Sequence, residues 1–150
     1  MLLVLGQFRV VFRSIRRHYR RVEQHAGVSG AQLWALAHVA QHPGSNVGEL
    51  ARALAIHPST ASNLINRLVS LGLVVRRREG PDRRVVRLHA SARSRGVLKR
   101  APQPLIGVLQ QALSGLPPPG LNGLHRHLAS LIRAMKIKDI HGHSVPLSDA

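Results

Sequence analysis

The sequence predicts a mainly α-helical fold with one small β-hairpin and further helices at both ends. Apolar residues recur at alternating spacings of three and four through most of the chain, which is typical of amphipathic helices. Two short β-branched runs around a Gly-Pro-Asp turn interrupt this pattern. Apolar residues make up 44% of the chain but aromatic residues only 3%, which favours helices packed through Leu, Val, Ile and Ala. The 150 residues are enough for one domain with a hydrophobic core.

Residues 3–25 are predicted to form an amphipathic helix. Its apolar residues form one narrow stripe, and arginines fill the other faces: the stripe contains Leu5, Phe8, Phe12, Ile15, Tyr19 and Val22. Such a stripe must be buried against the body of the domain or against a second subunit. We therefore assign Phe8, Phe12 and Ile15 as candidate dimerisation residues.

Two further helices have recognisable start signals. Ser29 can cap a helix that ends before the Pro43–Gly44 turn. Asn46 can cap the next, short helix, and Glu49 stands three residues later as its capping partner.

A fourth helix is predicted from about Pro58 to Leu71, closed by Gly72, and its two faces differ in chemistry. One face is apolar: Ala61, Leu64, Ile65 and Leu68. The opposite face has no acidic residue and is rich in small hydroxyls and amides: Ser59, Thr60, Ser62, Asn63, Asn66, Arg67 and Ser70. Ser, Thr and Asn are poor helix formers, whereas a solvated face usually carries Glu and Lys. Small polar side chains can reach base edges in a major groove about 12 Å wide, so this face, up to Arg67, is a candidate DNA-binding surface.

The hairpin is predicted from residues 73–75 and 85–88, which bracket the Glu79–Asp82 turn. Arginines surround this turn, and an arginine at a protruding hairpin tip fits a narrow minor groove. The candidate DNA-binding residues of this wing are Arg77, Arg78, Asp82, Arg83 and Arg84. Asp82 is expected to bond a neighbouring arginine or the turn backbone. The alternative is a basic hairpin that is merely solvated.

Helical periodicity returns at Ser91 and continues to about residue 136. Pro102 and Pro104 predict a kink or break within it, and residues 117–120 predict a turn before the last helix. The last helix again has an apolar stripe, from which we assign dimerisation roles to Leu124, Leu128 and Leu131. Residues 138–150 are predicted to be a disordered tail. The predicted organisation is a single domain over residues 1–137, with a central lobe at about 29–90 and dimerisation helices at about 3–25 and 91–136.

Charge is the strongest global signal. Lys and Arg total 22 against 6 acidic residues, for a formal net charge of +16, and such a field attracts polyanions such as nucleic acid. An anionic membrane surface is the weaker candidate, and the apolar runs are too short for a membrane span, so we expect a cytoplasmic, nucleoid-associated protein. The absence of cysteine excludes disulfides and thiolate zinc sites. His38 and His42 are four residues apart and could share a helix face, but no carboxylate lies near them in the sequence. Because the six acids are also scattered along the chain, we expect no metal, cofactor or enzymatic activity.

Helix, turn, helix and wing together resemble the MarR family of transcriptional regulators over roughly residues 5–136. The resemblance is carried by Glu49–Ala51, Ser59–Ser62, Arg67–Leu68, Leu71–Val74 and Asp82–Arg84. It implies a winged helix-turn-helix in a triangular homodimer, with the recognition helix in the major groove and the wing arginine in the minor groove. Ser94 departs from the glycine usual in the family, and Pro102 and Pro104 interrupt a helix of the dimer arm.

Three functions stay open at this point. The chain is expected to be a dimeric regulator that binds a pseudo-palindromic operator in double-stranded DNA. The alternatives are a non-specific architectural DNA-binding protein and a winged helix used for protein contacts, although the acid-free face of the fourth helix argues against the latter. The resemblance also suggests a small-molecule effector pocket lined by Tyr19 and Trp34, while ordinary core positions for both aromatics are the favoured alternative.

Overall fold

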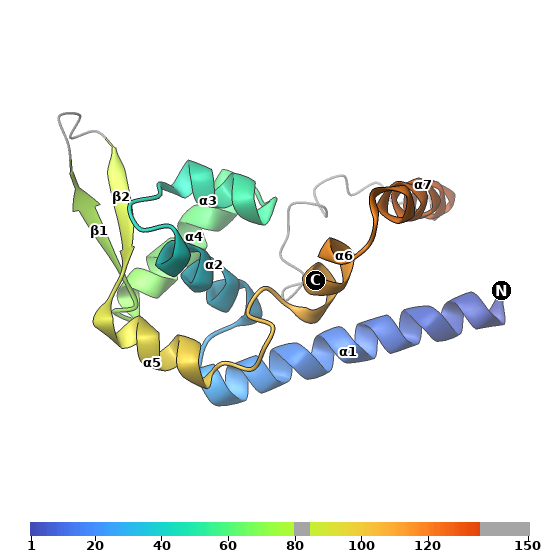
Figure 1. Ribbon diagram of the computed structural model, residues 1–150, viewed down its shortest axis with the longest axis horizontal. Helices are drawn as coiled ribbons and strands as arrows, with labels where there is room; N and C mark the ends of the chain where they lie inside the picture. The colour runs from blue at the N-terminus through green and yellow to red at the C-terminus, as the bar shows by residue number, and fades with distance from the viewer. Residues whose placement is uncertain (80–84, 136–150) are drawn as a thin grey trace.

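The computed structural model describes residues 1–79 and 85–135, and within them it confirms a mainly helical fold with one hairpin (Figure 1). The elements follow in this order: α1 (Leu2–Ala26), α2 (Gly30–Gln41), α3 (Val47–Leu54), α4 (Pro58–Ser70), β1 (Val74–Arg78), β2 (Val86–Ala90), α5 (Ala92–Arg100), α6 (Val108–Ser114) and α7 (Pro118–Ala134).

The predicted capping residues are confirmed. Ser29 Oγ accepts a hydrogen bond from the Gln32 backbone amide at 3.3 Å, and the Gln32 side chain accepts from the Ser29 amide at 3.2 Å. Asn46 and Glu49 make the same reciprocal pair at the start of α3, at 2.9 and 2.8 Å. These bonds satisfy amides that have no partner inside the helix, so both helices begin where the sequence places them.

The hairpin is joined to the helical body by a third extended segment. Strands β1 and β2 are antiparallel, with Val74 opposite Ala90 and Arg78 opposite Val86. On the other side of β2, the Leu88 amide donates to the Ser45 carbonyl, and the Gly44 amide donates to the Leu88 carbonyl, both at 2.8 Å. The loop between α2 and α3 therefore holds the base of the wing.

The helix predicted to break at the prolines does break. Helix α5 ends at Arg100, and residues 101–107 form an irregular linker before α6. Ser94 is buried in α5, where its Oγ donates to the Ser91 carbonyl at 2.6 Å.

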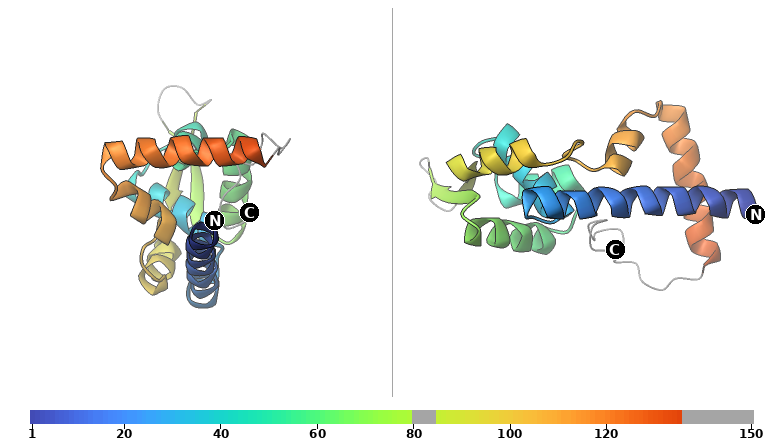
Figure 2. Two further views of the ribbon diagram at one scale, coloured as in Figure 1. Left: turned by 90° about the vertical axis from the view of Figure 1, so that its right-hand side faces the viewer. Right: turned by 90° about the horizontal axis from the view of Figure 1, so that it is seen from below.

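The hydrophobic core lies in a lobe made of α2, α3, α4, the hairpin, α5 and the C-terminal part of α1. The buried side chains of this core come from each of these elements and include Val22, Leu36, Leu50, Leu68 and Leu88. The N-terminal half of α1, α6 and α7 extend from this lobe on one side and form an arm (Figures 1 and 2). Neither α6 nor α7 contains a buried residue, so the arm has little packing of its own.

Candidate nucleic-acid interface

Helix α4 has the two faces that the sequence predicts. Its buried residues are the four expected ones: Ala61, Leu64, Ile65 and Leu68. On the opposite face Ser59, Asn63, Asn66 and Arg67 are exposed, whereas Thr60 and Ser62 are half-buried at its margins. The core thus presents the acid-free polar face of α4 to solvent.

The N-terminus of α4 depends on His57, which the sequence analysis did not assign to the interface. His57 Nδ1 accepts from the Ser59 amide at 3.3 Å and from the Ser59 hydroxyl at 2.7 Å. Pro58 follows as the first helical residue, a position where its missing amide is not needed. The position of a histidine directly before Pro-Ser could have indicated this N-cap in the sequence, but histidine is not among the common N-cap residues.

The two asparagines of this face have different surroundings. Arg76 Nη2 on strand β1 donates to Asn66 Oδ1 at 2.6 Å, which links α4 to the hairpin. This bond occupies one lone pair of the Asn66 oxygen and orients its side chain toward Arg76, whereas bidentate pairing of an asparagine with adenine needs both amide atoms. In the part of the chain that is described, the Asn63 side chain makes no hydrogen bond. Asn63 is therefore the asparagine of this face that is free to pair bidentately.

Charged side chains make contacts along the wing. Arg77 Nη1 lies 3.6 Å from Glu79 Oε1, and His89 Nε2 lies 3.2 Å from Glu79 Oε2. Arg87 Nη1 donates to the Gly44 carbonyl at 3.1 Å, which ties β2 to the loop before α3. Arg78 is exposed at the end of β1. The predicted contacts Asp82, Arg83 and Arg84 lie outside the described residues.

The candidate dimerisation residues divide into two groups. Phe8 and Phe12 stack with ring centroids 6.2 Å apart, and Phe12 is 57% exposed. Leu124, Leu128 and Leu131 are likewise exposed along one side of α7. Ile15, in contrast, is buried by its own chain, so it is not available on the exposed apolar surface of the arm.

Tyr19 and Trp34 occupy positions typical of core aromatics. The Tyr19 ring lies directly against the backbone of Gly30, where a Cβ would overlap it, and it contacts the His18 ring at a centroid distance of 5.8 Å. Trp34 is half-buried against the hydrophobic core. The hollow that the structure shows on α1 is lined by Phe12 and arginines, and by neither of these two aromatics.

His38 and His42 lie together at the C-terminal end of α2. Their rings stack at a centroid distance of 4.3 Å, which confirms that they share a helix face. Burial lowers the pKa of His38, the nearby His42 lowers it further, and Glu49 acts in the opposite direction. Within residues 1–79 and 85–135, no three potential ligands gather as they would around a metal ion. Among the same residues, none of the helices has the length and apolarity to cross a bilayer.

Comparison with known proteins shows what this geometry is similar to. Residues 26–85 match the model of the MarR family. The HTH-type transcriptional repressor MdtR of Bacillus subtilis (strain 168) is 31% identical over 78 residues, which are 52% of this chain and 50% of the repressor. The chain thus spans about half the length of this curated relative.

Solved structures extend the likeness to most of the chain. A mutant of S. aureus MepR bound to an oligodeoxyribonucleotide superimposes with a TM-score of 0.57 and 18% identity, over 88% of this chain and 97% of that one. The transcriptional regulator BldR of Sulfolobus solfataricus gives 0.57 and 24%, over 86% and 94%. At these identities the structures establish the fold. Residues 26–85 are therefore similar to the winged helix-turn-helix of the MarR family, and most of the chain shares the overall fold of these two solved structures.

Proposed function

We propose that the chain is a sequence-specific DNA-binding transcriptional regulator that acts as a homodimer on a pseudo-palindromic operator. Helix α4 enters the major groove, and the wing reaches the adjacent minor groove. The observation that carries this proposal is the exposed, acid-free polar face of α4, where Asn63 has both amide atoms available. Base-edge contacts from such a face supply sequence discrimination, while the wing cations supply affinity.

The homodimer is supported by the exposed leucines of α7 and the aromatics of α1. Leu128 and Leu131 are 36% and 41% exposed, and they lie about one helical turn apart. Leucines in such a row are typical of helix–helix interfaces. In this arrangement the chain is a single domain over residues 1–137. Its lobe at about 29–90 binds DNA, and its remaining helices join two subunits. The dimer acts in the cytoplasm, on the nucleoid.

The proposal is tested with an operator selected from a pool of randomised duplexes. The selected duplex and a scrambled duplex of equal length are then titrated with the wild-type chain at one fixed salt concentration. We expect a preference of about 10³-fold or more for the selected duplex. Equal affinities would contradict the proposal and favour a non-specific architectural protein.

A comparison of Asn63→Ala with the control Ser70→Ala on the same helix tests whether α4 recognises the DNA sequence. Ser70 Oγ donates to the Arg67 carbonyl within α4, so removal of this hydroxyl leaves the proposed DNA-binding surface in place.

A small-molecule effector stays a prediction. Tyr19 and Trp34, which were predicted to line its pocket, make the contacts of core aromatics.

A further inference from the structure

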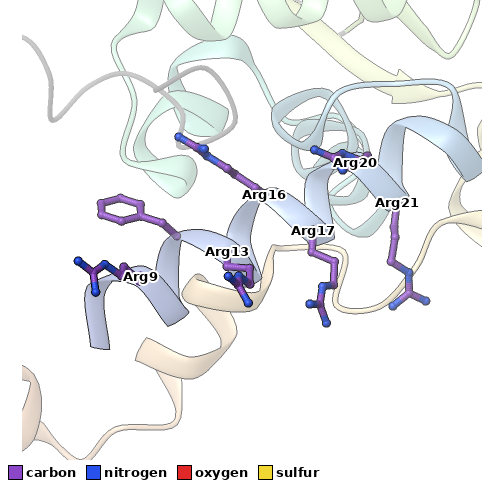
Figure 3. Close-up of a pocket in the computed structure, with 7 residues that line it drawn as sticks. Arg9, Arg13, Arg16, Arg17, Arg20 and Arg21 are labelled. Atoms are coloured by element: carbon purple, nitrogen blue, oxygen red, sulfur yellow. The ribbon is translucent and has the colours of Figure 1, made fainter. Parts of the chain in front are cut away.

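Six arginines, which we call the arginine face, crowd the outward side of α1. Together with Phe12 they line an open hollow of about 640 Å³ (Figure 3): Arg9, Arg13, Arg16, Arg17, Arg20 and Arg21. Ile15, His18 and Val22 are buried on the opposite side of the helix. Folding therefore leaves the arginine face on the surface.

The arginines form two rows along the helix. In Figure 3, Arg16 and Arg20 project to one side of α1, while Arg17 and Arg21 project to the other. Neighbours within a row are four residues apart, which is about 6 Å along the axis, and Arg9 lies about 18 Å from Arg21. The six guanidinium groups that line the hollow therefore follow the helix axis.

This charge has no counterpart on the protein surface that is described. Both ion pairs found within residues 1–79 and 85–135 use Glu79 of the wing, and Glu49 is engaged in capping α3. Glu23 is the acidic residue of α1 itself, and it forms no ion pair within the described chain. Like charges four residues apart destabilise a helix, so six of them on one face are unfavourable unless an anion binds there.

We propose that the arginine face is a second DNA-backbone contact, which binds phosphates in addition to those held by α4 and the wing. The inference rests on the proposed function. Guanidinium groups bind phosphate oxygens through two parallel hydrogen bonds. Charges spread over about 18 Å match a chain of phosphates, since a single small anion would neutralise only one or two of them. Both α1 and α4 are visible from below in the right-hand view of Figure 2.

The test compares two triple variants that remove equal charge. Arg13→Gln, Arg17→Gln and Arg21→Gln together weaken the arginine face, and Arg95→Gln, Lys99→Gln and Arg100→Gln on exposed positions of α5 are the matched control. Association with a random duplex of about 40 bp, which is roughly four helical turns, is measured by fluorescence anisotropy at salt concentrations between about 50 and 200 mM. The slope of log K against log salt is negative, and each lost phosphate contact reduces its magnitude by about 0.9. We expect the magnitude of the slope to fall by about 2–3 in the α1 variant and by less than about 1 in the α5 control.

The outcomes separate this inference from the proposed function. A wild-type slope in the α1 variant, with operator preference intact, overturns the arginine face as a DNA contact and leaves the proposed function standing. A reduced slope in a chain without operator preference supports the arginine face and contradicts the sequence-specific regulator. A wild-type slope on DNA combined with lost sedimentation on phosphatidylglycerol vesicles assigns the arginine face to a membrane, which also overturns the inference.

Discussion

At the scale of single residues, Asn63 and Asn66 are predicted to differ in what they contribute to DNA binding. Asn63→Ala is expected to cost roughly 1–3 kcal/mol of binding free energy on the operator and much less on scrambled DNA, because it removes a base-edge contact.

Asn66 accepts a hydrogen bond from Arg76, so Asn66→Ala, Arg76→Ala and the double variant should lose similar affinity for DNA. Binding titrations on both duplexes measure this cycle. Additive losses for Asn66 and Arg76 would show that their hydrogen bond does not persist on DNA.

A second residue-scale prediction concerns His18 of α1, which contacts the linker after α5. Burial lowers the pKa of His18 below the ordinary 6.5, Arg21 lowers it further, and a hydrogen bond with the Pro104 backbone raises it. The unfolded chain therefore takes up the proton first as the pH falls. The stability that depends on neutral His18 is present above about pH 6.5 and is lost as the pH falls through the lowered folded pKa.

Urea unfolding at several pH values between about 5 and 7.5 tests His18. His18→Gln should lose less stability than the wild type between these limits, even though its stability at neutral pH is lower. His125→Gln on exposed α7 is the control and should keep the wild-type pH dependence. An unchanged pH dependence in His18→Gln would assign the acid sensitivity to other groups, of which His38 is the first candidate because its pKa is also lowered.

At the scale of elements, the contact between α1 and α2 depends on the absence of a side chain at Gly30. A Cβ at Gly30 would overlap the Tyr19 ring, so Gly30→Ala must displace an aromatic side chain and should cost about 1–3 kcal/mol of unfolding free energy. Gly6→Ala is the matched control in the same fold, since nothing lies within 4 Å of a Cβ there. It should stabilise α1 by about 0.5–1 kcal/mol, as alanine does inside a helix. Equal effects in thermal unfolding would mean that Tyr19 is not packed on Gly30.

At the scale of the whole molecule, the exposed side of α7 is predicted to hold two subunits together. Leu128→Glu with Leu131→Glu should yield a monomer in sedimentation at micromolar concentration, because charges would replace exposed apolar side chains at the interface. Operator affinity should fall as well, since the two half-sites would no longer be bound by one particle. Asn122→Glu with Ser130→Glu adds the same charge on the other side of α7 and should leave the dimer intact. A monomeric wild-type chain would contradict the dimer at once.

The sequence alone determined the features that depend on nearby residues. The capping pairs at Ser29 and Asn46, the buried face of α4 and the break after α5 all follow from hydrogen bonds, periodicity or steric limits within a few positions. Periodicity likewise predicted the helical span of α1. The paired β-branched runs predicted the hairpin, although its strands begin and end up to three residues from the predicted positions.

Only the tertiary structure decided which residues of these elements contact one another. It divides the stripe of α1, burying Ile15 and Val22 while leaving Phe12 exposed on the arm. It also engages Asn66 with Arg76, although the sequence analysis treated both asparagines alike. The anchoring of Leu88 by Ser45, far earlier in the chain, has no local signal. Pairings of this kind depend on how helices and strands pack across long separations in the chain, and periodicity reports only which face of an element is buried, not what covers it.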